Sequence, residues 1–213
     1  MEKGKCFSAC NRGQRKKSDF YQTPFSITRQ LLMYEYFDKY LSVMDPCDGK
    51  GAITNQLNNY FRNGVYGNDI SYNADFLDWD NWAFDYQEEL MRVDYIITNP
   101  PFSLSFEFIQ KSKEVAKNKF AMLLPLSYLH GQKRYNNKIF LDSKYPLVRV
   151  YVFTRYPLLS DNIRLDGKYN TGMIAYAWYI WEKNKSNLNP YIPIHPTIHW
   201  IDNQKYVLSK KDK

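Results

Sequence analysis

The most distinctive chemistry in the chain lies in four consecutive residues, Asn99-Pro100-Pro101-Phe102, which directly follow a short apolar run. The two prolines remove two backbone N–H donors and fix two φ angles, so the preceding carbonyl is held in one direction. The Asn99 side-chain oxygen and the Pro100 carbonyl then form two acceptors that suit an amino group bearing two hydrogens. Phe102 adds a flat ring on which a purine can stack. The alternative interpretation is a turn at the end of a strand, followed by a core phenylalanine.

A second motif, Asp45-Pro46-Cys47-Asp48-Gly49-Lys50-Gly51, follows another short apolar run. Its two glycines allow a tight turn and a close approach of the backbone to a ligand. The helix expected behind them offers unpaired N–H groups at its first turn. Ala52 follows the second glycine, so the Gly-Lys-Ser/Thr sequence of a phosphate-binding P-loop is not formed here. The motif is interpreted as a ligand-binding turn, and a purely structural turn is the alternative.

Acidic residues follow the next expected strand. Asp69 lies 24 positions beyond Asp45, where a carboxylate can hydrogen-bond a ribose diol. Asp75 falls in the following loop and could accept a hydrogen bond from an adenine amino group, with Asp78 and Asp80 as competing candidates. A helix cap or a loop carboxylate is the alternative for each of them.

The elements that must position these residues alternate along the chain. Strands are expected over 41–44, 65–70, 93–98, 120–124, 148–153 and 173–181, and helices after Thr23-Pro24, after 49–51 and over 104–116. The polar stretch 132–144 is compatible with a further helix. Such alternation predicts an α/β fold with a mainly parallel sheet and helices on both faces. Ligands of open parallel sheets bind at the carboxyl ends of the strands, where both motifs lie.

Charge is distributed unevenly along the chain, which has a net charge of +7. Residues 1–17 carry six Lys/Arg and one Glu and are expected to form a flexible basic arm. Residues 18–110 carry five basic and fourteen acidic side chains, whereas 111–168 carry twelve basic and four acidic ones. This difference suggests that the basic part faces a polyanion, although solvated helix surfaces are the alternative. Residues 18–183 are expected to form one domain, followed by a tail at 184–213.

Composition excludes several classes of protein. The apolar stretches are of strand length, far short of a membrane span, and no apolar signal region follows the first basic residues. Three cysteines fit a reducing, cytoplasmic compartment better than a disulfide framework. Cys6 and Cys10 lack a second Cys or His pair, so no metal site is expected.

Taken together, the motifs resemble those of the Rossmann-like amino-methyltransferases, in particular the DNA adenine-N6 methyltransferases with an Asn-Pro-Pro-Phe motif. Residues 45–51 resemble the cofactor motif of the family, and residues 99–102 its catalytic tetrapeptide. Residues 19–24 resemble its N-terminal motif, which packs against the methionine end of the cofactor, and residues 176–182 its last strand. The resemblance runs from about residue 19 to 183, in the gamma-like motif order. Asp48 and Lys50 depart from it, because smaller or acidic residues are more usual there.

The resemblance implies a doubly wound, seven-stranded sheet and S-adenosylmethionine as the cofactor. It assigns catalysis to Asn99, Pro100, Pro101 and Phe102. It assigns cofactor binding to Tyr21, Thr23, Pro24, Asp45, Pro46, Cys47, Gly49, Gly51, Asp69, Ile70, Asp75, Phe76 and Asn99. It also implies direct methyl transfer to a flipped adenine, with no covalent intermediate and no metal.

DNA is the partner that the resemblance implies, and a specificity subunit or a homodimer would be compatible with it. The candidates for phosphate contacts are basic residues of the loops 127–145 and 154–170: Lys133, Arg134, Lys138, Arg155, Arg164 and Lys168. Adenine in RNA and a protein glutamine are alternative substrates, although glutamine-modifying relatives usually carry Tyr in place of Phe102. A non-catalytic DNA-binding subunit with the same fold is the remaining alternative.

Overall fold

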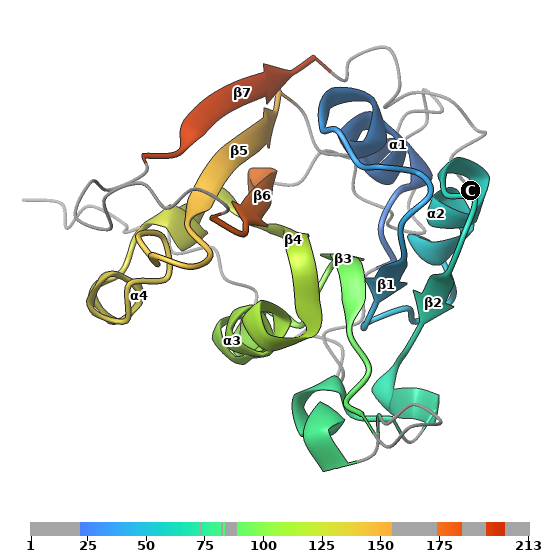
Figure 1. Cartoon of the computed structure of the whole chain (residues 1–213). Coiled ribbons are helices and arrows are strands. Elements are labelled where there is room, and N and C mark those ends of the chain that lie inside the picture. Colours follow the sequence, from blue (N-terminus) through green and yellow to red (C-terminus); the bar gives the residue numbers. More distant parts are fainter. Residues whose placement is uncertain are drawn as a thin grey trace, which may run out of the picture.

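The structure is a computed structural model that describes residues 22–72, 74–81, 83, 89–154, 174–184 and 195–202. Its centre is a seven-stranded sheet with the order β2-β1-β3-β4-β6-β5-β7 (Figure 1). The strands are β1 (Val43–Asp45), β2 (Val65–Gly67), β3 (Val93–Thr98), β4 (Ala116–Pro125), β5 (Leu147–Phe153), β6 (Tyr176–Glu182) and β7 (Thr197–Ile201). Strands β1 to β4 pair in parallel, as do β5 and β7, whereas β6 runs antiparallel to both of its neighbours. The expected α/β fold with a mainly parallel sheet is therefore present, and the two antiparallel pairs are those of β6.

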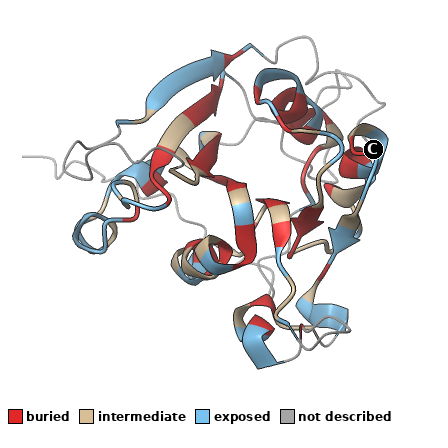
Figure 2. Ribbon diagram, viewed as in Figure 1, coloured by how far each residue is buried: buried red, intermediate tan, exposed pale blue. Residues whose placement is uncertain are grey.

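Helices cover both faces of this sheet. The pair α1 (Phe25–Tyr34) and α2 (Thr54–Tyr60) lies on one side, and α3 (Ser105–Val115) and α4 (Gln132–Asn136) lie on the other (Figure 1). Successive residues of β4 contribute to two separate apolar clusters, because side chains alternate between the faces of a strand. Figure 2 shows the buried residues concentrated in the central strands and in the inward faces of α1 and α3.

The seventh strand corrects the expectation that residues 184–213 form a tail. Strand β7 pairs in parallel with β5 over its whole length, from the Arg149–Thr197 pair to the Phe153–Ile201 pair. The strand is five residues long, and its Thr-Ile-His-Trp-Ile sequence alternates polar and apolar residues up to Trp200, a strand pattern that the sequence-based expectation overlooked. The resemblance implied seven strands, whereas the sequence pattern located only six.

Two local differences from the sequence-based expectations concern helices. Helix α2 begins at Thr54 rather than at the glycine turn. The polar stretch 132–144 is helical only to Asn136, and Lys138 adopts a φ of 51° just beyond the helix end. A non-glycine residue in this left-handed region ends a helix.

A buried charge cluster joins α1 to three strands at the edge of the sheet opposite the carboxyl ends of the parallel strands. The carboxylate of Glu35 lies 2.8 Å from Lys119 Nζ and 2.6 Å from Arg149 Nε. Arg149 also binds Glu182, and the Tyr151 hydroxyl donates to Glu35 at 2.9 Å. Burial raises the pKa of Glu35, but the bonds from Arg149 and Lys119 outweigh it and hold that pKa below its usual value. We call these five residues the Glu35 cluster.

Candidate active site

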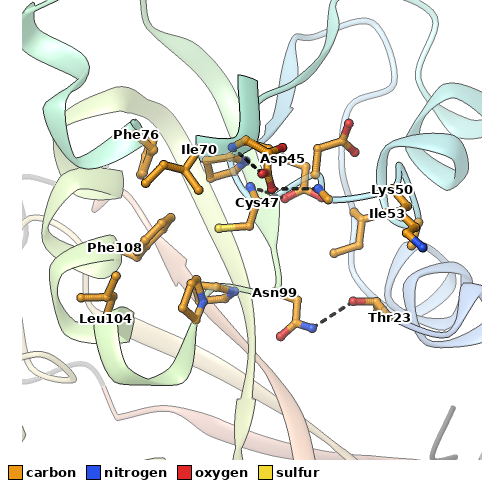
Figure 3. Close-up of a pocket in the computed structure, with 18 of the residues that line it drawn as sticks. Thr23, Asp45, Cys47, Lys50, Ile53, Ile70, Phe76, Asn99, Leu104 and Phe108 are labelled. Carbon is orange, nitrogen blue, oxygen red and sulfur yellow. Dashed lines mark hydrogen bonds between the residues drawn. The ribbon is translucent and has the colours of Figure 1, made fainter. Parts of the chain in front are cut away.

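The two sequence motifs share one cavity of about 490 Å³ at the carboxyl ends of β1 and β3. Its wall is formed by the segment before α1, the turn after β1, the loop after β2, the Asn-Pro-Pro-Phe motif after β3 and the start of α3 (Figure 3). A parallel arrangement brings these strand ends to one edge of the sheet, although the segments are far apart in the sequence.

The turn after β1 depends on glycine at three positions. Gly49 and Gly51 have φ values of 56° and 76°, in the left-handed region that disfavours other residues. Gly67, across from the turn on β2, has no room for a side chain, because a Cβ atom there would lie 2.5 Å from Asp48 Oδ2. The turn is anchored to the loop after β2 by a 2.9 Å bond from the Asp48 N–H to the Asn68 carbonyl.

Asp69 connects the loop after β2 to the glycine turn. Its Oδ2 accepts a hydrogen bond from the Gly49 N–H at 3.0 Å, and its Oδ1 accepts one from the Ser71 N–H at 2.9 Å. Partial burial raises the pKa of Asp69, but the bonds from Ser71 and Gly49 more than compensate, so the pKa lies below its usual value. The cavity therefore contains an ionised carboxylate in a fixed orientation.

Asp45, at the end of β1, is fully buried and has the opposite electrostatic character. Its burial, together with the negative charges of Asp48 and Asp69, raises its pKa to about 7, although the hydrogen bond from the Cys47 N–H and the nearby Thr98 hydroxyl lower it. The Cys47 N–H bond to Asp45 Oδ1 measures 3.0 Å and closes the first turn of the motif. Burial also raises the pKa of the Cys47 thiol, so this cysteine is a poor candidate for a nucleophile.

The Asn-Pro-Pro-Phe motif begins with an amide that is held by a hydrogen bond across the cavity. Asn99 Nδ2 donates to Thr23 Oγ1 at 3.1 Å (Figure 3). The Phe102 ring, half-buried, lies 5.7 Å from the ring of Tyr176 at an interplanar angle of 36°. The Ser105 hydroxyl donates to the Phe102 carbonyl at 3.0 Å, which fixes the motif to the start of α3.

The wall facing the acidic groups is apolar and partly aromatic. Phe76 and Phe108 stack with ring centroids 5.4 Å apart and an interplanar angle of 29°. Ile70, Leu77 and Leu104 extend this surface, and Figure 3 shows Phe76, Phe108 and Leu104 on one side of the cavity. An aromatic ring system fits between such a wall and the polar turn after β1.

Most of the predicted site residues that the structure describes line this cavity. They are Thr23, Asp45, Pro46, Cys47, Gly49, Asp69, Ile70, Asp75, Phe76, Asn99, Pro100, Pro101 and Phe102. Pro24 and Gly51 do not line it, and Tyr21 lies outside the described residues. The wall also includes residues that the sequence analysis did not assign to the site: Gln22, Asp48, Lys50, Ala52, Ile53, Ser71, Leu77, Leu104 and Phe108. Several of them are next to a predicted residue in the sequence, and this position could have been used to predict that they line the cavity.

The predicted phosphate-binding residues separate into different environments. Lys133 and Lys138 are exposed, and Lys133 Nζ lies 4.9 Å from the Phe106 ring at the start of α3. Arg134 instead stacks on the buried Tyr128 ring at 4.3 Å. Arg155, Arg164 and Lys168 lie outside the described residues.

A second hollow, of about 420 Å³, lies beside α4. It is lined by Tyr135, Asn136, Lys138 and Leu141. Exposed aromatic, amide and cationic side chains thus occur together on the segment that follows the carboxyl end of β4.

Metal-binding clusters and membrane-spanning helices are both absent from the described ranges. Within these ranges, no group of three or more His, Cys, Asp or Glu side chains is arranged to hold a metal ion. None of the described helices combines the length and the apolar character required to cross a membrane.

No protein-family model matches the sequence, and no curated protein matches it. Solved structures do match its fold. A protein provisionally described as a class I S-adenosylmethionine-dependent methyltransferase from Listeria monocytogenes is 12% identical, with a TM-score of 0.50 over 82% of this chain and 63% of that one. A modification subunit of a provisionally described type I restriction enzyme from Vibrio vulnificus is 14% identical, with a TM-score of 0.53 over 82% and 46%. A provisionally described RNA methyltransferase from Pyrococcus horikoshii is 18% identical, with a TM-score of 0.53 over 76% and 87%.

These similarities establish the fold, which is that of the class I S-adenosylmethionine-dependent methyltransferases. The chain spans 63% and 46% of the length of the first two of these proteins.

Proposed function

We propose that the chain is an S-adenosylmethionine-dependent methyltransferase that methylates N6 of adenine in DNA. The observation that carries the proposal is the single cavity in which the glycine turn, Asp69 and the Asn99 amide meet. If the glycine turn and the Asn-Pro-Pro-Phe motif served only the fold, they would not be expected to line the same cavity. Such convergence of polar groups in a concave site is what a catalytic site requires.

The residues present fit the cofactor. The ionised Asp69 would accept from its ribose hydroxyls, and the Phe76 and Phe108 wall would hold its adenine ring. The glycine turn would let the backbone approach it closely. Bound there, the cofactor supplies a methyl group activated by a sulfonium.

The chain's own residues would act on the acceptor nitrogen. The Asn99 side-chain oxygen and the Pro100 carbonyl would accept its two hydrogens, which favours a tetrahedral nitrogen with a localised lone pair. The same oxygens stabilise the positive charge that develops on that nitrogen. The Phe102 ring would stack on the base and, supported by Tyr176, fix its position for in-line transfer. The target base must leave the duplex to reach this pocket.

The surface around α4 supports a nucleic acid as the substrate. Lys133 contacts Phe106, four residues beyond Phe102, so its positive charge lies beside the motif. Lys138 and Tyr135 border the second hollow, and the combination of a cation with an exposed aromatic ring suits a phosphate and an unstacked base. Arg134, packed on Tyr128, would shape this segment rather than bind phosphate.

The proposal is tested by incubating the protein with methyl-labelled cofactor and either adenine-containing DNA, RNA or a glutamine peptide, followed by nucleoside and amino-acid analysis. We expect N6-methyladenine in DNA, and a decrease of about 100- to 1,000-fold in kcat for Asn99→Ala, since a preorganised hydrogen-bonding group is lost. Asn59→Ala, an exposed asparagine of α2, is the matched control and should retain full activity. Label in methylcytosine, in RNA alone or in the peptide alone would contradict the proposal.

A further inference from the structure

We infer that Thr23 is a positioning residue that holds the Asn99 amide with its oxygen toward the substrate, an inference that rests on the proposed function. Thr23 precedes α1, is only 4% exposed and lies 76 positions from Asn99 in the sequence. Its Oγ1 nevertheless accepts a 3.1 Å hydrogen bond from Asn99 Nδ2. The resemblance alone assigned Thr23 to cofactor binding, whereas this contact ties it to the amide that would act on the substrate.

The direction of the amide decides what the site can bind. Rotation of an asparagine side chain by half a turn about its last bond changes its shape little, but exchanges an acceptor for two donors. With Nδ2 toward the substrate, Asn99 would present hydrogens to the hydrogens of an amino group. With Oδ1 toward the substrate, it presents the acceptor that the proposed chemistry needs.

Thr23 selects the second orientation. Because Nδ2 donates to Thr23, Oδ1 is placed on the other side of the amide. A hydroxyl has one proton and two lone pairs, so it could instead donate to Oδ1. In the structure, however, Oγ1 accepts from Nδ2, so the hydroxyl proton points away from the amide and Asn99 keeps this orientation.

The first test compares Thr23→Val, which keeps the shape but cannot accept, with Thr23→Ser, which keeps the hydroxyl. We expect kcat to fall about tenfold in the valine variant, the effect of one lost hydrogen bond, and to recover in the serine variant. Binding of S-adenosylhomocysteine, measured by calorimetry, should stay within about threefold of wild type in both. Cofactor affinity that falls in parallel with kcat, or a valine variant as fast as wild type, would overturn the inference.

Thr28→Val is the matched control. Thr28 lies on α1, is fully buried, and its hydroxyl has no hydrogen-bond partner among the described residues. The same substitution there should leave kcat unchanged. A comparable loss in this control would show that the effect of Thr23→Val is one of packing.

A second variant, at Asn99 itself, makes the orientation of the side chain irrelevant. In Asn99→Asp both side-chain oxygens accept, so adding Thr23→Val should lower its residual rate by less than about threefold. A full tenfold loss in this background would indicate a role unrelated to the amide and would contradict the inference.

The third readout needs neither cofactor nor substrate. The side-chain amide resonances of Asn99, assigned by their loss in Asn99→Ala, should show slow hydrogen exchange in wild type and Thr23→Ser, and fast exchange in Thr23→Val. Unchanged exchange in the valine variant would overturn the inference. If wild type methylates no DNA, the proposed function fails, yet these spectra still decide the role of Thr23.

Discussion

The cavity and the Glu35 cluster both bury carboxylates at an edge of the same sheet, but they place them in opposite electrostatic environments. Glu35 is enclosed by Lys119 and Arg149, and its pKa is lowered. Asp45 is buried among other acidic groups, and its pKa is raised to about 7. The cluster is internally neutralised and connects α1 to the strands, whereas the charged groups that act on Asp45 in the cavity are the carboxylates of Asp48 and Asp69. The Glu35 cluster thus has the character of a structural polar site, and the cavity that of a site suited to a ligand.

The largest effect is expected from opening the Glu35 cluster. Glu35→Gln removes the buried carboxylate that both Lys119 and Arg149 bind and leaves the partly exposed Glu182 as their remaining anion, so the free energy of unfolding should fall by about 3 kcal/mol, the lower end of the range for a broken buried pair. Urea denaturation measures this quantity. Glu114→Gln, at an exposed ion pair with Lys111, should change it by less than about 1 kcal/mol. Equal losses in the two variants would remove the distinction between the cluster and an ordinary surface pair.

A smaller effect, on binding rather than stability, is expected at Asp69. Asp69→Asn replaces an ionised acceptor by a neutral amide, so affinity for S-adenosylhomocysteine should fall about 10- to 100-fold. Calorimetry measures the change. Asp80→Asn, at an exposed pair with Lys111, is the control and should bind as wild type does. Unaltered binding in Asp69→Asn would remove this carboxylate from the cofactor site.

The two buried carboxylates should also give opposite dependences of stability on pH. Asp45 has a raised pKa in the folded chain, so its contribution is fully present below its unfolded pKa and is lost as pH rises through about 7. The loss between pH 5 and 7 should reach about 2 kcal/mol and should disappear in Asp45→Asn. Glu35 has a lowered pKa, so its contribution is present above its unfolded pKa and is lost as pH falls through the folded value. Denaturation curves across pH 3–8 for both variants test the contrast, and parallel profiles would contradict it.

The smallest effect is expected from a lysine, and it contrasts a buried, paired lysine of the Glu35 cluster with an exposed lysine beside α4. Lys119 is held inside the cluster, whereas Lys138 is exposed beside the second hollow. Lys138→Gln should reduce the slope of log K against log salt for DNA binding by about 0.9, the value for one lost phosphate contact. Lys117→Gln, at the exposed start of β4, should leave the slope unchanged. Fluorescence anisotropy at several salt concentrations measures both, and equal slopes would place the DNA elsewhere.

The residues that line the cavity could be predicted better than the edges of the sheet. Residues 99–102 and 45–51 could be recognised because prolines and glycines restrict the backbone in ways that depend little on the rest of the fold. The apolar wall could not be predicted in the same way, because Phe108 reaches the cavity only through the packing of α3 against Phe76.

The edges of the sheet were predicted least well. Strand β7 was overlooked although residues 197–200 alternate polar and apolar side chains, because a pattern this short does not distinguish an edge strand from an irregular segment. The antiparallel insertion of β6 between β4 and β5 is a matter of long-range pairing, which local sequence patterns do not encode. The Glu35 cluster was also invisible, since its members are separated by up to 147 positions (35 to 182) and each looks like a surface charge when taken alone.

Because Gly67 has no side chain, the effect of substitutions at this position differs from what its exposure suggests. Gly67 is exposed and does not line the cavity, so both exposure and distance would class it as tolerant. An alanine there would nevertheless require the Asp48 carboxylate, which is part of the cavity wall, to rotate away. Substitutions at position 67 should therefore be less well tolerated than substitutions at its exposed neighbour Tyr66.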